Sequence, residues 1–356
     1  MEELIASIHM HTRYSDGTGS HEDIGQAALK SGLDVVIVTD HNILVSGMER
    51  YYQKDKRQTL MLVGEEIHDQ ARLPQKSHLL VIGAGRELSS FAPNPQRLLD
   101  QVQKAEGLAF IAHPYENALP LFDEDDISWD DWDVHGYTGI ELWNNLSELK
   151  NVIHGKLSAI FYALFPQYMA RGPLPPALKK WDELTASGNR VVAIGGADAH
   201  ALNAKLGPMR RTIFPYEFHF RSITNHILTP TSLTGDLVED RKMILFAFRT
   251  GHIYIGYDLP APTRGFRFNA HGREQTAGMG DSINLDTGIT FQIRLPLKTE
   301  CRLMKDGVVI KIWHNKDIFT YIANQSGVYR VEVYVNFLGK KRTWIISNPI
   351  YIYESK

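Results

Sequence analysis

The stretch Ile5-Ala-Ser-Ile-His-Met-His-Thr-Arg-Tyr-Ser-Asp-Gly17 decides the fold, because it closes a short apolar strand with two histidines. Residues i and i+2 of a strand point to the same face, so His9 and His11 present their imidazoles side by side. Gly17 permits a tight turn in which the Asp16 carboxylate swings back toward both rings. The pattern indicates a metal site, with a strand that ends in two surface histidines as the alternative.

Composition places the chain among globular proteins with a sizeable core. It has 356 residues, of which 43% are hydrophobic and 22% charged, and this length favours two domains or a barrel with an appendage. The net charge of −3 gives no reason to expect nucleic-acid or membrane partners. The single Cys301 excludes an internal disulfide and a cysteine-rich zinc site. No secretory signal pattern is visible, so a cytoplasmic protein is expected. The oligomeric state is left open.

Strand and helix patterns alternate through the first two thirds of the chain, which predicts a parallel sheet. Ser20 to Asp23 has the form of a capping box, and Gly32 ends the helix that follows. The apolar run of residues 34–39 reads as a strand buried on both faces and ends at His41. A strand, a short helix and a strand form a βαβ unit. His41 therefore emerges at the same sheet edge as His9 and His11, where α/β barrels carry their chemistry.

Later apolar runs repeat the arrangement. Strands are expected at residues 60–63, 78–82, 108–112, 139–144 and 190–194. A polar helix is expected over residues 47–58. Apolar residues from Leu149 to Leu164 recur at helical spacing, which predicts a core-facing stripe. Most of these strands end next to histidines and carboxylates, whereas His78 stands at the start of its strand.

Nine candidate ligands follow from this pattern. Burying so many titratable groups costs too much free energy unless they bind metal or pair with one another. Imidazole and carboxylate together suit zinc, manganese or iron better than calcium or magnesium. The candidates are His9, His11, Asp16, His41, Glu66, His78, His113, Asp198 and His200.

The composition changes after the proline-rich segment 258–262. Alternating apolar and polar residues in 289–295 and 328–335, with Gly and Asn turns between, are typical of a small antiparallel β-sandwich. The expected division is therefore a hydrolase barrel over residues 1–258 and a β-sandwich domain over residues 259–356. No ligand-type cluster lies beyond residue 260, so the second domain is expected to supply no metal ligand.

The motifs resemble those of the PHP (polymerase and histidinol phosphatase) superfamily of metal-dependent phosphoesterases. The resemblance covers roughly residues 1–258. The form of residues 39–42 and the ending 344–351 resemble the CehA/McbA-like branch. The segments that carry the resemblance are His9-x-His11, Ser15-Asp-Gly17, Thr39-Asp-His-Asn42, Gly64-Glu-Glu-Ile67, His78, Ala112-His-Pro114 and Ala197-Asp-Ala-His200.

The resemblance implies a distorted (β/α)7 TIM-like barrel with a trinuclear site of two to three divalent ions (Mn, Zn or Fe). Glu66 is preferred to Glu65 as the bridging ligand because it precedes an apolar residue, Ile67. Asp40 is expected to orient His41 through a hydrogen bond. The implied ligand sets are His9, His11, Glu66 and Asp198 for the first ion, Glu66, His78 and His113 for the second, and Asp16, His41 and His200 for the third.

The implied activity is hydrolysis of a phosphate monoester or diester of a small molecule or nucleotide. A hydroxide between the ions, held by Glu66 with Asp198 and His200 nearby, attacks phosphorus in line. Arg13 and Arg211 are candidates to clamp the phosphate. His68 and His252 are candidates for a general acid.

Three alternatives stay open on the sequence alone. An amidohydrolase-type barrel also opens with His-x-His and hydrolyses C–N or C–O bonds. An exonuclease acting on nucleic-acid ends is disfavoured by the near-neutral charge and the lack of basic stripes interleaved with aromatic residues. A non-enzymatic protein that recognises a partner through its β-sandwich is disfavoured by the complete ligand set.

Overall fold

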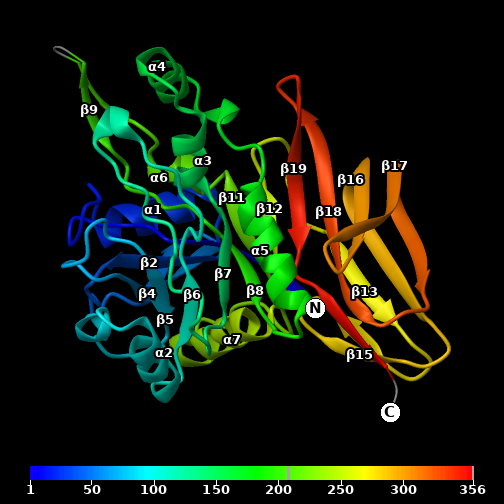
Figure 1. Ribbon diagram of the computed structural model, residues 1–356. Coiled ribbons are helices and arrows are strands. Elements are labelled where there is room, and N and C mark those ends of the chain that lie inside the picture. Colours follow the sequence, from blue (N-terminus) through cyan, green and yellow to red (C-terminus); the bar gives the residue numbers. More distant parts are fainter. Residues whose placement is uncertain (207–208, 355–356) are drawn as a thin grey trace.

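The computed structural model describes residues 1–206 and 209–354, without the side chains of residues 203–211. A mixed α/β region comes first and a β-rich region follows it (Figure 1). The elements of the first region are β1 (Glu2–Ile8), α1 (His21–Ser31), β2 (Val35–His41), β3 (Arg50–Lys54), β4 (Arg57–Ile67), β5 (Leu79–Ile82), η1 (Ser89–Phe91), α2 (Pro95–Lys104), β6 (Leu108–Ile111), η2 (Pro120–Phe122), β7 (Gly139–Asn144), α3 (Asn145–Val152), α4 (Lys156–Leu164), η3 (Pro166–Tyr168), α5 (Pro175–Ala186), β8 (Val192–Gly196), β9 (Asn203–Leu206), β10 (Met209–Thr212), α6 (Tyr216–His219), β11 (Ile223–Thr229), α7 (Leu237–Thr250) and β12 (Ile253–Tyr257).

The second region is built almost wholly of antiparallel strands, with β15 and β20 as a parallel pair. Its strands surround one apolar core that also takes in Leu228 and Tyr254 of the first region. The strands are β13 (Arg267–His271), β14 (Thr276–Gly278), β15 (Ser282–Leu285), β16 (Ile289–Lys305), β17 (Val308–Ala323), β18 (Gly327–Phe337), β19 (Lys340–Ser347) and β20 (Ile350–Glu354).

The first region is a distorted barrel, which confirms the expected fold class. Strands β1, β2 and β4 are parallel neighbours, as are β6, β7 and β8. The ring closes between β8 and β1, where the Ala197 N–H donates to the Ile8 carbonyl at 2.9 Å and Met10 forms a parallel bridge with Ala199. The carboxyl ends of distant strands therefore meet at one mouth.

Strand β5 distorts the ring because it runs antiparallel to both β4 and β6. The start of an antiparallel strand lies at the same sheet edge as the ends of its parallel neighbours. His78 directly precedes β5 and so reaches the same edge as the other candidate ligands. Its odd sequence position, at a strand start, thus has a topological cause.

Helix α7 closes the opposite end of the barrel. Its Ile244, Ala247 and Phe248 pack with Leu4 and Leu108 in one buried cluster. The Asp236 carboxylate caps its first turn, and Gly251 ends it in the left-handed conformation. Apolar packing closes this end of the barrel, and the candidate ligands lie at the other end.

The prediction of a helix over residues 47–58 is wrong, because this segment contains the strand β3. Arg50–Lys54 pairs antiparallel with the start of β4, and a turn with Asp55 at φ 56° joins the two strands. Tyr52 is buried, whereas the residues around it are mostly exposed. This strand lies at an edge of the sheet, and most of its residues are polar. It therefore lacks the apolar run by which the inner strands were predicted.

The apolar stripe over residues 149–164 forms two helices instead of one. Ile153 adopts an extended conformation that ends α3, and Gly155 begins α4. Leu149 is buried, but Leu157, Ile160 and Leu164 are 86, 53 and 47% exposed. The break changes the direction in which the apolar side chains of α4 point, so most of those after Ile153 do not pack into the core as expected.

The two regions share one hydrogen-bonded sheet. β12 pairs with β11 on one side and with β19 on the other. The division at residues 258 and 259 stays a prediction, since no contact of the described residues marks that boundary. No helix in the described part of the chain is long and apolar enough to cross a membrane.

A buried ionic network lies where the regions meet. The Glu3 Oε1 atom lies 2.8 Å from His226 Nδ1 and accepts from the Tyr254 hydroxyl at 2.6 Å. The Glu3 Oε2 atom accepts from Arg267 of β13 at 2.6 Å. Burial acts to raise the pKa of Glu3, but these hydrogen bonds outweigh it and lower the pKa to about 2.

We predict that Glu3→Gln lowers the free energy of unfolding at pH 7 by about 3–5 kcal/mol, because it leaves buried cationic partners uncompensated. The folded-state pKa of Glu3 lies below its unfolded value, so this stabilisation is present above pH 5 and lost as pH falls toward 2. Urea unfolding at several pH values measures it. Glu2→Gln, on the exposed neighbour, is the control. Equal effects of both substitutions would contradict the role of Glu3.

Candidate metal centre

The barrel mouth opens into a cavity of about 520 Å³. Its walls combine strand ends, the loops after β6 and β8, and helix α3. Glu66 lines this cavity, and it contacts His9 and His11, which are fully buried behind the lining. The other candidate ligands that line this cavity are Asp16, His41, His78, His113, Asp198 and His200.

Glu66 lies at the centre of the cluster, with its two oxygens facing different histidine pairs. The Oε2 atom lies 2.9 Å from His9 Nε2 and 3.2 Å from His11 Nε2. The Oε1 atom lies 2.7 Å from His78 Nδ1 and 2.9 Å from His113 Nε2. One carboxylate thus separates two groups of nitrogen ligands, which is the arrangement a bridging ligand needs.

Asp198 completes the first of these groups. Its Oδ1 atom lies 3.6 Å from His9 Nε2 and 3.5 Å from His11 Nε2, the same two nitrogens that face Glu66. The Asn144 side-chain amide donates to the other oxygen of Asp198 at 3.1 Å. Two imidazoles and two carboxylates therefore converge on one point.

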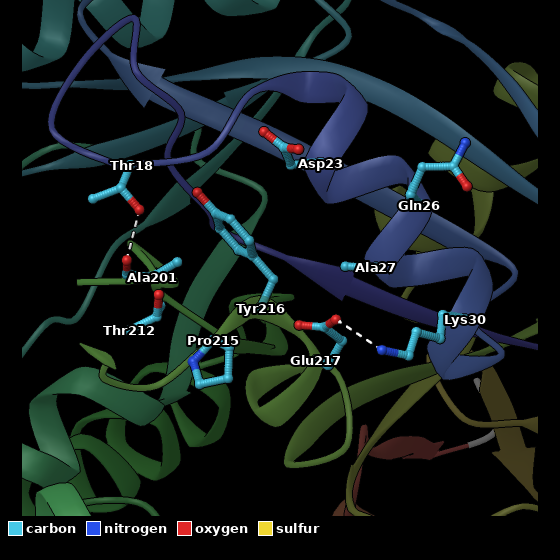
Figure 2. Close-up of a pocket in the computed structure, with 10 residues that line it drawn as sticks. All are labelled: Thr18, Asp23, Gln26, Ala27, Lys30, Ala201, Thr212, Pro215, Tyr216 and Glu217. Atoms are coloured by element: carbon cyan, nitrogen blue, oxygen red, sulfur yellow. Dashed lines mark hydrogen bonds and ion pairs between the residues drawn. The ribbon is translucent and has the colours of Figure 1, made fainter. Parts of the chain in front are cut away.

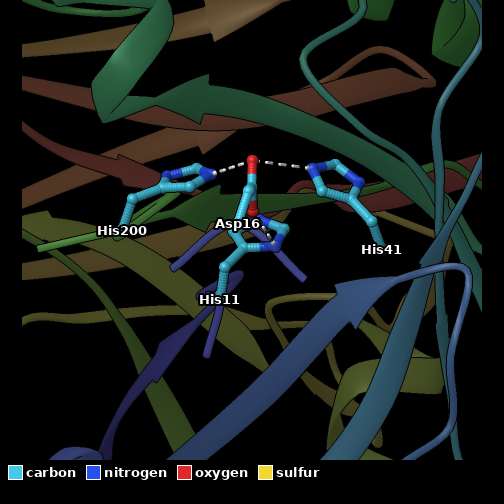
Figure 3. A group of neighbouring side chains, drawn as sticks. All are labelled: His11, Asp16, His41 and His200. Atoms are coloured by element: carbon cyan, nitrogen blue, oxygen red, sulfur yellow. Dashed lines mark ion pairs between the residues drawn. The ribbon is translucent and has the colours of Figure 1, made fainter. Parts of the chain in front are cut away.

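A separate group forms around Asp16, nearer to solvent (Figure 3). Its Oδ2 atom lies 3.2 Å from His200 Nε2 and 3.6 Å from His41 Nε2, and its Oδ1 atom lies 3.6 Å from His11 Nδ1. The rings of His41 and His200 stack on either side of His11, with centroids 4.4 and 4.3 Å away. The two nitrogens of His11 thus face two different groups.

Buried nitrogens without hydrogen bonds show that this donor set suits metal ions. Among the described residues, both ring nitrogens of His11 and Nδ1 of His41 and His113 are buried with no hydrogen-bond partner. Such groups are costly unless something else binds them. Burial lowers the pKa of His41 to about 3, so this ring is neutral at pH 7 and has a lone pair to offer.

Carboxylates dominate the electrostatics of the deeper groups. Burial acts to lower the pKa values of His11 and His113, but Asp198, Glu66 and Glu116 outweigh it and raise both to about 9. The pKa values of Glu66 and Asp198 are held well below the usual range by the histidines, despite burial. Positive charge therefore stabilises this cluster, and either protons or metal ions can supply it.

The alternation of β4 separates the two adjacent glutamates. Glu66 points into the barrel, whereas Glu65 points outward, accepts from the Leu88 N–H at 3.3 Å and faces Glu87. Burial and the Glu87 carboxylate raise the pKa of Glu65 to about 9, so it is protonated at pH 7. Strand geometry thus favours Glu66 as the candidate ligand.

Three candidate ligands have left-handed backbones. His9, His113 and Asp198 have φ angles of 65°, 25° and 48°, directly after the ends of β1, β6 and β8 or close to them. Non-glycine residues adopt this region at a cost and mostly where surrounding structure imposes it. The turn at each strand end aims the side chain across the mouth instead of along the sheet.

The loop that carries Asp16 is held from both sides. Asp40 accepts from the Thr12 N–H and the Ser15 hydroxyl, both at 2.7 Å, and its described hydrogen bonds go to this loop instead of to His41. On the other side the Tyr216 hydroxyl donates to the His11 carbonyl at 2.7 Å. Figure 2 shows Tyr216 reaching from α6 toward this loop, across a separate hollow of about 370 Å³ that none of the nine candidates lines.

The four candidates for a general acid or a phosphate clamp do not gather at one place. His68 stacks on His78 with centroids 4.2 Å apart, and burial lowers its pKa to about 4. His252 instead contacts Asp281 of the second region at 2.8 Å. Arg13 is exposed beside Asp23, at 3.6 Å. The side chain of Arg211 lies outside the described residues.

Glu141 belongs to the site and was missed by the sequence reasoning. Its Oε1 accepts from His9 Nδ1 at 2.7 Å, and its Oε2 accepts from the His113 N–H at 2.7 Å and from Asn144 at 2.9 Å. The bond to Nδ1 leaves Nε2 of His9 to face Glu66, as in carboxylate–histidine–metal triads. A Cβ on Gly196 would lie 1.5 Å from Glu141 Oε1, so any other residue here would displace the Glu141 carboxylate. A lone carboxylate in the buried strand 139–144 was the available signal.

Comparison with known proteins adds three findings. The family model of the PHP domain matches residues 7–164. The uncharacterized protein MJ1587 of Methanocaldococcus jannaschii is 24% identical over 123 residues, which are 32% of this chain and 68% of that protein. A crystal structure from Bacteroides vulgatus, of a two-domain protein containing a predicted PHP-like metal-dependent phosphoesterase, is 15% identical with a TM-score of 0.46, covering 97% of this chain and 95% of that one.

We predict that Glu141→Gln weakens metal binding about 10–100-fold, because the His9 ring loses its charged partner while the fold keeps its hydrogen-bonding shape. A competition titration of the metal-free protein against a chromophoric chelator measures this. Glu183→Gln, on the exposed face of α5, is the control. Metal affinity equal to that of the wild-type protein would show that Glu141 does not orient a ligand.

Proposed function

We propose that this chain, whose residues 7–164 match the family model of the PHP domain, is a metal-dependent phosphoesterase acting on small phosphate esters. The observation that carries this proposal is the position of Glu66, whose two oxygens face two pairs of histidines at 2.7–3.2 Å. Two cations held on either side of a carboxylate suit in-line displacement at phosphorus.

The proposed ligand sets follow the contacts of the cluster. The first group shares Glu66 Oε2 and Asp198 Oδ1, the second shares Glu66 Oε1, and the third surrounds Asp16. The sets are His9, His11, Glu66 and Asp198, then Glu66, His78 and His113, and then Asp16, His41 and His200. His11 Nδ1, at 3.6 Å from Asp16 Oδ1, also faces the third group.

The donor chemistry favours two to three Mn, Zn or Fe ions over Ca or Mg, because imidazole supplies most of the ligands. Such ions supply the Lewis acidity that offsets charge on the phosphoryl oxygens. The chain itself contributes position: Glu141 and Asn144 fix the rings and carboxylates beneath the phosphate, and Asp40 and Tyr216 fix the loop of Asp16. The CehA/McbA-like branch and a cytoplasmic location stay predictions from the sequence.

We predict that the protein loaded with manganese or zinc hydrolyses p-nitrophenyl phosphate, and that a chelator abolishes the activity. Glu66→Gln should lower kcat/KM at least about 100-fold, since removal of a shared ligand exceeds the effect of a residue behind it. Glu65→Gln is the matched control, because Glu65 is protonated, faces outward and stands next in the same strand. Turnover of an amide or lactone without turnover of any phosphate ester would overturn the proposal.

The third group has its own test. We predict that His200→Ala folds normally and loses about one metal equivalent, because its described side-chain contacts are with Asp16, the ring of His11, and the carboxylate and main-chain carbonyl of Asp198. Elemental analysis after reconstitution gives the count, and His154→Ala on an exposed residue is the control. Full metal content in His200→Ala would mean that the third set is wrong.

A further inference from the structure

A buried lysine shares the cavity with the metal cluster. Lys150 of α3 is only 7% exposed, yet it lines the same hollow as His78 and His113. Its Nζ atom lies 2.5 Å from Glu116 Oε1 and 2.5 Å from Glu124 Oε2. A lysine ammonium has three donors, and it is rarely buried without partners of this kind.

The two carboxylates that hold Lys150 differ in burial. Glu116 is buried, and its second oxygen accepts from the Ser147 hydroxyl at 2.5 Å, so it is fixed. Glu124 follows η2 on an exposed loop, and its side chain is 46% exposed. An ion pair with one solvent-exposed partner contributes little, so Glu124 can leave Lys150 while Glu116 stays.

Lys150 is near the reacting centre but not part of it. Glu116 Oε2 lies 4.0 Å from Nδ1 of His113, whose Nε2 contacts Glu66. One carboxylate therefore separates the ammonium from a candidate metal ligand. The cavity wall also includes the apolar side chains of Ile127, Leu146 and Leu202. This space therefore brings together the candidate metal ligands, an apolar wall and Lys150.

We propose that Lys150 binds a carboxylate of the substrate, and that Glu124 occupies this position in the free protein. The proposal rests on the proposed phosphoesterase activity and names its substrate class: phosphate esters of an apolar, ring-sized body that carries a carboxylate. Replacing one carboxylate by another leaves the charge around Lys150 unchanged, so no buried charge is left unpaired. Lys150 is thereby a specificity-determining residue.

The test compares 3- and 4-carboxyphenyl phosphate with the corresponding carbamoylphenyl phosphates, which are neutral and of equal shape. For at least one of the two pairs, the kcat/KM of the wild-type protein should be at least about tenfold higher for the carboxyphenyl phosphate than for its carbamoylphenyl counterpart. The difference should lie mainly in KM, as expected for a charged hydrogen bond. Lys150→Met should reduce that preference to near one. Glu124→Gln should increase it, because a competing carboxylate is removed.

Two further variants keep the test decisive. Lys150→Met leaves Glu116 buried without its cation, so the double variant Lys150→Met/Glu116→Gln serves if the single variant does not fold. Lys242→Met, an exposed lysine of α7 paired with Glu239, is the control and should keep the wild-type preference. Equal kcat/KM for both members of each substrate pair, or an unchanged preference in the Lys150 variants, would overturn the inference. Turnover of p-nitrophenyl phosphate without turnover of any of the four esters would also overturn the inference, whereas turnover of none of these five esters would overturn the proposed function.

Discussion

One carboxylate buried among five histidines is the constraint on which the rest of the barrel depends. Glu66 is fully buried and lies within 3.4 Å of nitrogens of His9, His11, His41, His78 and His113. Burying a carboxylate costs a large free energy unless hydrogen-bond donors or cations surround its oxygens. Strands β1, β2, β4, β5 and β6 must therefore end, or in the case of β5 begin, at one point around it. The reversed direction of β5 and the left-handed backbones at His9, His113 and Asp198 both serve this convergence.

The same requirement explains the polar residues behind the cluster. A histidine that offers one nitrogen to a metal needs a partner for the other, and Glu141 is that partner for His9. Asp40 and Tyr216 hold the loop of Asp16, which is the most exposed member of the cluster. At the far end of the barrel, Ile244, Ala247 and Phe248 of α7 pack against the strands, away from the candidate ligands. The apolar packing of α7 thus lies at one end of the barrel, and the candidate metal ligands lie at the other.

The sequence predicted the parts of this structure that have a local signal. Apolar runs followed by His or Asp marked most inner strands, and alternation marked the β-rich region after residue 262. Edge strand β3 was missed because its residues are polar, and the break at Ile153 was missed because helical spacing continued across it. Glu141, Glu116 and Lys150 were missed for another reason. Their contacts span 132 and 34 residues, and a local signal such as the lone carboxylate in the strand 139–144 does not show which distant residue it meets.

The proposed function requires that the nine side chains hold metal in three groups. Anomalous X-ray diffraction from crystals of the metal-loaded protein, recorded above and below the absorption edge of the metal, tests it most directly. One peak is expected between Glu66 and Asp198, a second between Glu66 and the pair His78 and His113, and a third beside Asp16. An anomalous peak coordinated by any residue beyond 260, or no peak at Glu66, would contradict it.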